Sequence, residues 1–205
     1  MRKMKGEGVM SNTNHHPASP APAGLVAFAA GCFCFGAIHG GLIQGNPLPL
    51  LCSWVAGAFV IQFVVANREL DEGNLLGGNV FMFFACFFML ANTVGCVMKT
   101  ILPFLGIPFN TTIEGFGWLA CTIALITWTP CYYKLSNGVM AIAVTGADIA
   151  LVIITLKDLG FAVPTIIASV ALFIAGSAAL YMAAAIQINA AFEKTILPVP
   201  GPWIK

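Results

Sequence analysis

Charged side chains are scarce in this chain of 205 residues. Only 8% of the residues are charged, against about a quarter of a soluble domain, and 59% are hydrophobic. A soluble chain of this length could not place so much apolar surface inside one core, so lipid must solvate the remainder. The composition excludes a soluble domain large enough for catalysis and predicts a polytopic integral membrane protein.

An excess of positive charge is also missing, because the formal net charge is +1. Without a basic surface, no nucleic-acid partner is expected. The seven cysteines lack metal-ligand spacing, so we interpret them as small packing residues and expect no metal and no cofactor. No predicted helix pairs His with Cys, Asp or Glu at metal spacing, and no nucleophile–base set is evident. We therefore do not expect an enzyme.

Long runs without charged residues mark the membrane spans. A bilayer core about 30 Å thick needs roughly 20 apolar residues as a helix. Pro47 and Pro49 divide the first run, which extends from Glu7 to Arg68, into two helices. The runs predict an all-α fold of six transmembrane helices per subunit, at residues 24–44, 48–66, 75–98, 115–132, 138–156 and 161–188.

Lysine and arginine positions predict the orientation. With the N-terminus in the cytoplasm, only Lys99 and Lys157 fall in loops on the opposite side. Both termini are therefore expected to be cytoplasmic, in a multi-pass protein of the inner or plasma membrane. We expect three parts: a polar, mobile tail at 1–22, the six-helix bundle at 23–190 and a short C-terminal tail at 191–205.

Small residues recur at spacings that allow two helices to approach closely. Gly36-x-x-x-Gly40 lies in the first predicted helix and Gly73-x-x-x-Gly77 at the start of the third. Such seams serve either packing within one chain or contacts between subunits. Composition does not distinguish these alternatives.

Three motifs follow one another along the chain. Pro20-Ala21-Pro22-Ala23-Gly24-Leu25-Val26-Ala27-Phe28 begins the first helix, Glu69-x-x-x-Gly73-Asn74-x-x-Gly77 precedes the third, and Asn189-x-x-Phe192-x-x-Thr195-Ile196-Leu197-Pro198 follows the last. Together they resemble the signatures of the acetate uptake transporter family over nearly the whole chain. Ser19 replaces the family's leading Asn and Ala23 its Leu, so the chain resembles a distant member.

The first motif also has a physical interpretation without the family. Pro20 and Pro22 stop the helix from extending backwards, and Gly24, which precedes Leu25 in the motif, lets the chain approach its neighbours. The helix N-terminus then carries partial positive charge and unpaired N–H groups, which favour a carboxylate. A loop that only anchors the helix is the alternative.

The resemblance implies a homo-oligomer, a hexamer in which each subunit encloses its own pore. It implies an apolar constriction made by one side chain from each of the first, third and fifth predicted helices, at residues 24–44, 75–98 and 138–156. By alignment these are Phe28, Phe84, where the family has Tyr, and Ala147, where it has Leu. The alignment of the fifth predicted helix could be shifted by one helical turn, so the residue equivalent to Ala147 could differ. A narrow apolar ring of this kind can gate by dewetting.

Polar side chains inside the predicted helices are candidates for the substrate path. They are Gln62, Asn74, His39, Asn92 and Gln187, and each is costly in hydrocarbon unless it is hydrogen-bonded or wet. The family also has Gln and Asn at the positions of Gln62 and Asn74. Each candidate could equally form a hydrogen bond between helices.

Asp148 is the only acidic residue placed well inside a predicted helix. An ionised carboxylate costs at least about 2.5–3.5 kcal/mol in hydrocarbon, so Asp148 should face a pore or a partner. It adjoins Ala147, where a fixed negative charge would repel a carboxylate. We hypothesise that Asp148 is protonated when substrate passes, which would link transport to pH. A structural hydrogen bond to a neighbouring helix is the alternative.

Two functions follow from these observations. The first is a transporter or channel for acetate and other short carboxylates such as succinate, with protons as a further partner. The second is a channel for a small neutral solute, such as urea, ammonia or the protonated acid, because few fixed cations line the predicted helices. A scaffold would leave the polar residues inside the helices unexplained.

Overall fold

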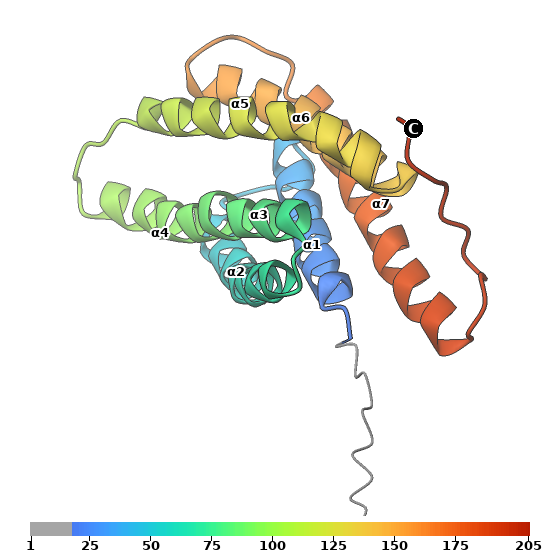
Figure 1. Cartoon of the computed structure of the whole chain (residues 1–205). Helices are drawn as coiled ribbons and strands as arrows, with labels where there is room; N and C mark the ends of the chain where they lie inside the picture. Colours follow the sequence, from blue (N-terminus) through green and yellow to red (C-terminus); the bar gives the residue numbers. More distant parts are fainter. Residues whose placement is uncertain (1–17) are drawn as a thin grey trace, which may run out of the picture.

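The computed structural model describes residues 18–205, where all regular secondary structure is helical. The mobile tail predicted at 1–22 falls mostly on residues 1–17, which lie outside the described part. The helices are α1 (Ala21–His39), α2 (Leu48–Asp71), α3 (Leu75–Phe83), the π-helix η1 (Phe84–Leu90), α4 (Ala91–Phe104), α5 (Thr112–Leu135), α6 (Gly138–Asp158) and α7 (Ile166–Ala191). Because α3, η1 and α4 form one continuous rod, residues 18–205 fold into six rods (Figure 1).

Five rods are long and apolar enough to cross a membrane. They are α1, α2, the α3–η1–α4 rod, α6 and α7. The 24-residue α5 is not among them. Its charges, Glu114 and Lys134, lie in its first and last turns, and its middle is made less apolar by Gly, Thr, Trp, Tyr and Pro residues. The prediction of an all-α, multi-pass bundle is confirmed, and α5 is the rod that falls short of that criterion.

Two predicted helix ends are wrong, and in each case a turn glycine follows the observed end. The first helix, expected to reach residue 44, ends at His39, and Gly41 follows with a φ of +66°. The third rod, expected to stop at residue 98, continues to Phe104 and is followed by Gly106 with a φ of +69°. Glycine adopts these left-handed conformations without a steric penalty and so commonly ends helices.

Two other boundaries differ for different reasons. The second helix was expected to end at residue 66, but its charged last turn stays helical to Asp71 and buries Glu69. The last helix was expected to begin at residue 161 and begins at Ile166, because Pro164 disfavours a helical conformation at the residue before it.

Helix α1 lies between α7 and α2, and α7 in turn packs against α6 (Figure 1). The Ser169 hydroxyl of α7 donates a hydrogen bond to the Gly36 carbonyl oxygen at 2.7 Å. A Cβ atom at Gly40 would lie 2.6 Å from the same hydroxyl oxygen. The Gly36-x-x-x-Gly40 seam therefore packs within the chain. The other predicted seam is wrong, because Gly73 lies in the turn before α3 with a φ of +82°.

The C-terminal segment 192–205 returns along α7 to the turn between α5 and α6 (Figure 1). The Tyr181 hydroxyl donates to the Pro198 carbonyl oxygen at 2.8 Å, and the Ile204 amide donates to the Tyr133 carbonyl oxygen at 2.9 Å. The Trp203 and Tyr133 rings lie 5.1 Å apart. The predicted short tail is thus packed against the bundle and holds the end of α5.

Candidate functional site

A cavity of about 270 Å³ opens where α1, α3 and α6 begin and α2, α5 and α7 end. We call it the Glu69 cavity. Its polar lining includes Gln62, Glu69, Asn74 and Asn137, and its apolar lining includes Leu25 of the first motif. The remaining lining residues are Ser19, Ala21, Phe28, Gly77, Val80, Phe81, Phe84, Tyr132, Ser136, Met140, Ala143, Val144, Ala147, Met182 and Ile186.

The first motif forms one wall of this cavity. Pro20 is the N-cap of α1 and Pro22 lies in its first turn, so the helix begins where the prolines allow it. A Cβ atom at Gly24 would lie 2.6 Å from the Phe81 ring, so glycine leaves room for this ring against α1. Leu25 and Phe28 of the same helix line the cavity beside it.

Glu69 and Asn74 form a polar part of the cavity lining, near the end of α2 and the start of α3. The Asn74 amide donates a hydrogen bond to the Glu69 carboxylate, while its side-chain oxygen accepts one from the Gly77 amide at 2.9 Å and caps α3. Glu69 is only 5% exposed. No lysine or arginine is among the lining residues described by the structure, so this cavity contains a carboxyl group and no cation.

Gln62 presents an unused hydrogen-bond acceptor in the same cavity. Its side chain is fully buried, and its Nε2 donates to the Gly24 carbonyl oxygen at 3.4 Å. Its Oε1 has no hydrogen-bond partner in the part of the chain that the structure describes. A buried acceptor without a donor is unfavourable. A solute in the cavity that carries an O–H or N–H group would satisfy it once neighbouring side chains moved aside, because Gln62 is fully buried.

The three residues aligned with the apolar constriction all line the Glu69 cavity. The rings of Phe28 from α1 and Phe84 from η1 lie edge to face, with centroids 4.8 Å apart. Ala147 from α6 is also buried. The structure therefore brings Phe28 and Phe84 into contact and places Ala147 on the same cavity wall. We call these three residues the first layer; their role as a constriction stays a prediction.

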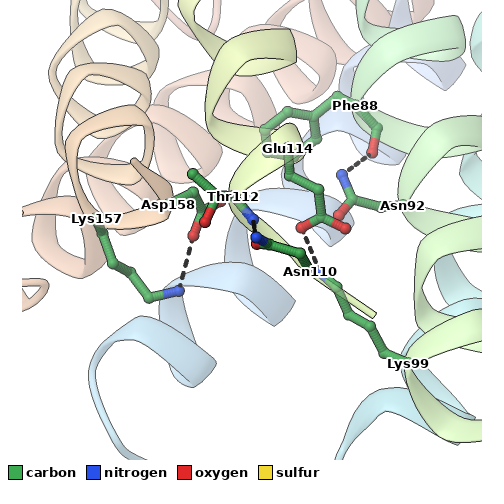
Figure 2. A network of polar contacts seen from close by, with 8 residues as sticks. All are labelled: Phe88, Asn92, Lys99, Asn110, Thr112, Glu114, Lys157 and Asp158. Atoms are coloured by element: carbon green, nitrogen blue, oxygen red, sulfur yellow. Dashed lines mark hydrogen bonds and ion pairs between the residues drawn. The ribbon is translucent and has the colours of Figure 1, made fainter. Parts of the chain in front are cut away.

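A second cavity, of about 140 Å³, lies at the opposite end of the bundle, where α1, α4 and α6 end and α2 and α5 begin. We call it the Lys99 cavity. His39 and Asn92 line it together with Phe35, Ile38, Leu48, Leu51, Phe88, Cys96, Lys99, Glu114, Trp118, Ile154, Lys157 and Asp158. Lys99 pairs with Glu114, and Lys157 pairs with Asp158 at 3.2 Å (Figure 2). Its charges are therefore balanced.

The structure places Asp148 away from both cavities. Its side chain lies toward α5, where the Thr129 hydroxyl donates a hydrogen bond to Oδ2 at 2.7 Å. Asp148 is not among the lining residues of either cavity. Its buried Oδ1 has no hydrogen-bond partner among residues 18–205. This geometry favours the structural alternative for Asp148, and the link to pH stays a prediction.

Sequence reasoning did not single out Glu69 or the two ion pairs as parts of the site. Glu69 lies in the charged run Arg68-Glu69-Leu70-Asp71-Glu72, so only its position four residues before Gly73-Asn74 in the second motif distinguishes it. The Lys99–Glu114 pair joins residues on either side of a loop. No local periodicity predicts such a contact.

The sequence matches no protein-family model and no curated protein. Among solved structures, the bacterial acetate channel SatP has a similar fold, with a TM-score of 0.74. The match covers 90% of this chain and 99% of that chain, at 19% sequence identity. The similarity confirms the resemblance at the level of the fold.

Proposed function

We propose that this protein is a membrane channel or transporter for acetate and other short carboxylates such as succinate, with the path inside each subunit. The arrangement of the two cavities carries this proposal. They open at opposite ends of one bundle and are separated by aromatic side chains. The fold shared with the acetate channel SatP supports the same function.

The chemistry of the Glu69 cavity favours a neutral permeating species. A carboxylate anion would meet Glu69 with no lysine or arginine in the lining to offset it. The free acceptor at Gln62 Oε1 would instead accept a hydrogen bond from the hydroxyl of a protonated acid. The same observation supports the second candidate function, a channel for urea or ammonia.

Uptake by proteoliposomes tests the proposal. Labelled acetate, succinate and urea are offered separately at several pH values, with protein-free liposomes as the blank. Acetate uptake above the blank, rising as the pH falls, supports carboxylate transport as the neutral acid. Uptake of urea without acetate supports the second function, and no uptake of any of the three contradicts both.

A blocked variant shows whether the solute passes through the bundle. Ala147→Phe adds a ring to the wall that already holds Phe28 and Phe84, and it should abolish uptake. Ile149→Phe is the matched control on the same helix, because Ile149 is exposed on the surface of the bundle. Equal uptake by both variants would contradict a path along the Glu69 cavity.

Assembly and orientation belong to the same proposal. The resemblance supports a hexamer, with each copy enclosing its own path in the lipid bilayer. The lysine and arginine distribution supports cytoplasmic termini, so the Glu69 cavity would open to the cytoplasm and the Lys99 cavity to the other side.

A further inference from the structure

We infer that the barrier between the two cavities has a second aromatic layer, formed by Phe88 with Phe35 and Trp118, that selects against longer solutes. This inference rests on the proposed function, because it concerns what passes along the same path. The residues that the resemblance aligns with the constriction, Phe28, Phe84 and Ala147, do not include any member of the second layer.

Phe88 is the centre of this layer. It is 3% exposed, and its ring lies edge to face with Phe35 at a centroid distance of 5.0 Å and with Trp118 at 5.6 Å. The three side chains come from η1, α1 and α5, so they approach from three sides of the bundle. At these distances the Phe88 ring is in contact with both of the other rings.

The cavity linings separate the two layers. Phe28 and Phe84 line the Glu69 cavity, whereas Phe35, Phe88 and Trp118 line the Lys99 cavity. The two linings share no residue in the described part of the chain. A solute that leaves one cavity therefore meets one layer first and must pass the other before it reaches the opposite cavity.

Helix η1 carries a ring of each layer. The Phe84 and Phe88 centroids lie 5.7 Å apart, again edge to face. The layers are therefore adjacent, and one element positions both. Besides α1 and η1, each layer has one further helix. Helix α6 supplies Ala147 to the first layer, and α5 supplies Trp118 to the second.

This spacing gives each layer a role in size selection. Acetate spans about 2.5 Å between its end atoms, and extended succinate spans about 6 Å, from ordinary bond lengths. Acetate can pass the layers one after the other, whereas succinate occupies both at once and requires them to open together. The second layer should therefore affect longer solutes more than acetate.

The exposed neighbour Phe87 offers a matched control. It lies beside Phe88 on η1, is 55% exposed and lines neither of the two cavities. It borders a separate, more open hollow that Trp118 also lines. In proteoliposomes, Phe88→Ala should raise the ratio of succinate to acetate uptake at least threefold, and Phe87→Ala should leave it unchanged. Equal ratios for the two variants overturn the second layer. Phe88→Leu, with size-exclusion chromatography, provides a milder variant if Phe88→Ala fails to fold.

Water flux tests the layer without any assumption about the solute. Phe28→Ala/Phe88→Ala removes a ring from each layer, whereas Phe28→Ala/Phe87→Ala leaves the second layer intact. Stopped-flow osmotic shrinkage should show severalfold faster water flux for the first double variant. Equal water flux overturns the inference even if the parent carries neither carboxylates nor urea. A parent inactive toward every solute, with unequal water flux, contradicts only the proposed function.

Discussion

Asn74 holds the Glu69 carboxylate through its side-chain amide and caps α3 through its side-chain oxygen. One residue thus ties the end of α2 to the start of the rod that carries Phe84 and Phe88. Asn137 caps α6 in the same way, accepting a hydrogen bond from the Met140 amide at 3.0 Å. The Asn137 amide, however, donates to the Met182 sulfur instead of a carboxylate.

This pair of caps predicts different outcomes for the same substitution. Asp caps a helix as well as Asn does, so Asn137→Asp should leave thermal stability nearly unchanged. Asn74→Asp keeps the cap but removes the donor to buried Glu69 and adds a like charge, which should cost about 1–3 kcal/mol. Thermal unfolding in detergent checks this. Equal melting temperatures would show that the Asn74–Glu69 bond contributes nothing.

The first aromatic layer predicts gain of flux on truncation. Phe28→Ala or Phe84→Ala should widen the passage and either raise solute flux or loosen selectivity, because each removes one ring of an edge-to-face pair. Uptake of labelled acetate and succinate by proteoliposomes measures the effect. Phe116→Ala, at an exposed position on α5, is the control. Unchanged transport in both well-folded variants would remove Phe28 and Phe84 from the path.

The proposed assembly predicts a single oligomer of six chains. Six copies of the 21.6 kDa subunit should appear together when the protein is purified in native-like lipid. Native mass spectrometry or mass photometry of nanodiscs measures the copy number. A preparation that contains only monomer or dimer would count decisively against a ring of subunits.

The hydrogen bonds of Asp148 predict its response to pH. Because its buried Oδ1 lacks a donor among the described residues, the neutral carboxyl loses less on burial than the carboxylate. Asn has the shape of the neutral form, and its amide can donate to Thr129. If Asp148 is a proton switch, Asp148→Asn keeps transport and flattens its pH dependence, with activity extending to higher pH. The structural alternative, which its position outside both cavities favours, leaves the pH profile unchanged.

Uptake measured from acidic to alkaline pH checks the Asp148 prediction. A variant with the parent's pH profile would eliminate the proton switch. A variant that loses its fold or its oligomer would support the structural role of Asp148 instead. Thr129→Val, which removes the hydroxyl at nearly constant volume, separates the loss of this bond from the loss of the titrating group.

The rods of the bundle could be predicted because charges are expensive in lipid, so long uncharged runs mark the spans. Helix ends were harder to predict, because charged residues such as Arg68 and Glu69 can continue a helix beyond the apolar run. The turn glycines Gly41 and Gly106 stop helices at points that hydrophobicity does not mark.

The site could be predicted in part. Motif counting led to Phe28 and Phe84, which the structure places in contact, and to Gln62 and Asn74, which line the same cavity. It did not lead to Phe88, because many Phe residues follow one another and only the packing distinguishes Phe88 from its exposed neighbour Phe87. Asp148 was expected near the path because it adjoins Ala147, but adjacent residues on a helix face different neighbours.

The π-helix η1 has a consequence for comparison with distant relatives. A π turn closes its hydrogen bonds over five residues instead of four, so it contains one residue more than the α turn it replaces. An ungapped alignment that starts at Gly73-Asn74 therefore stays in register up to Phe84, where η1 begins. An alignment with a relative whose third helix is α-helical throughout needs a one-residue gap after Leu90. Without that gap, the alignment equates residues that lie on different sides of the helix.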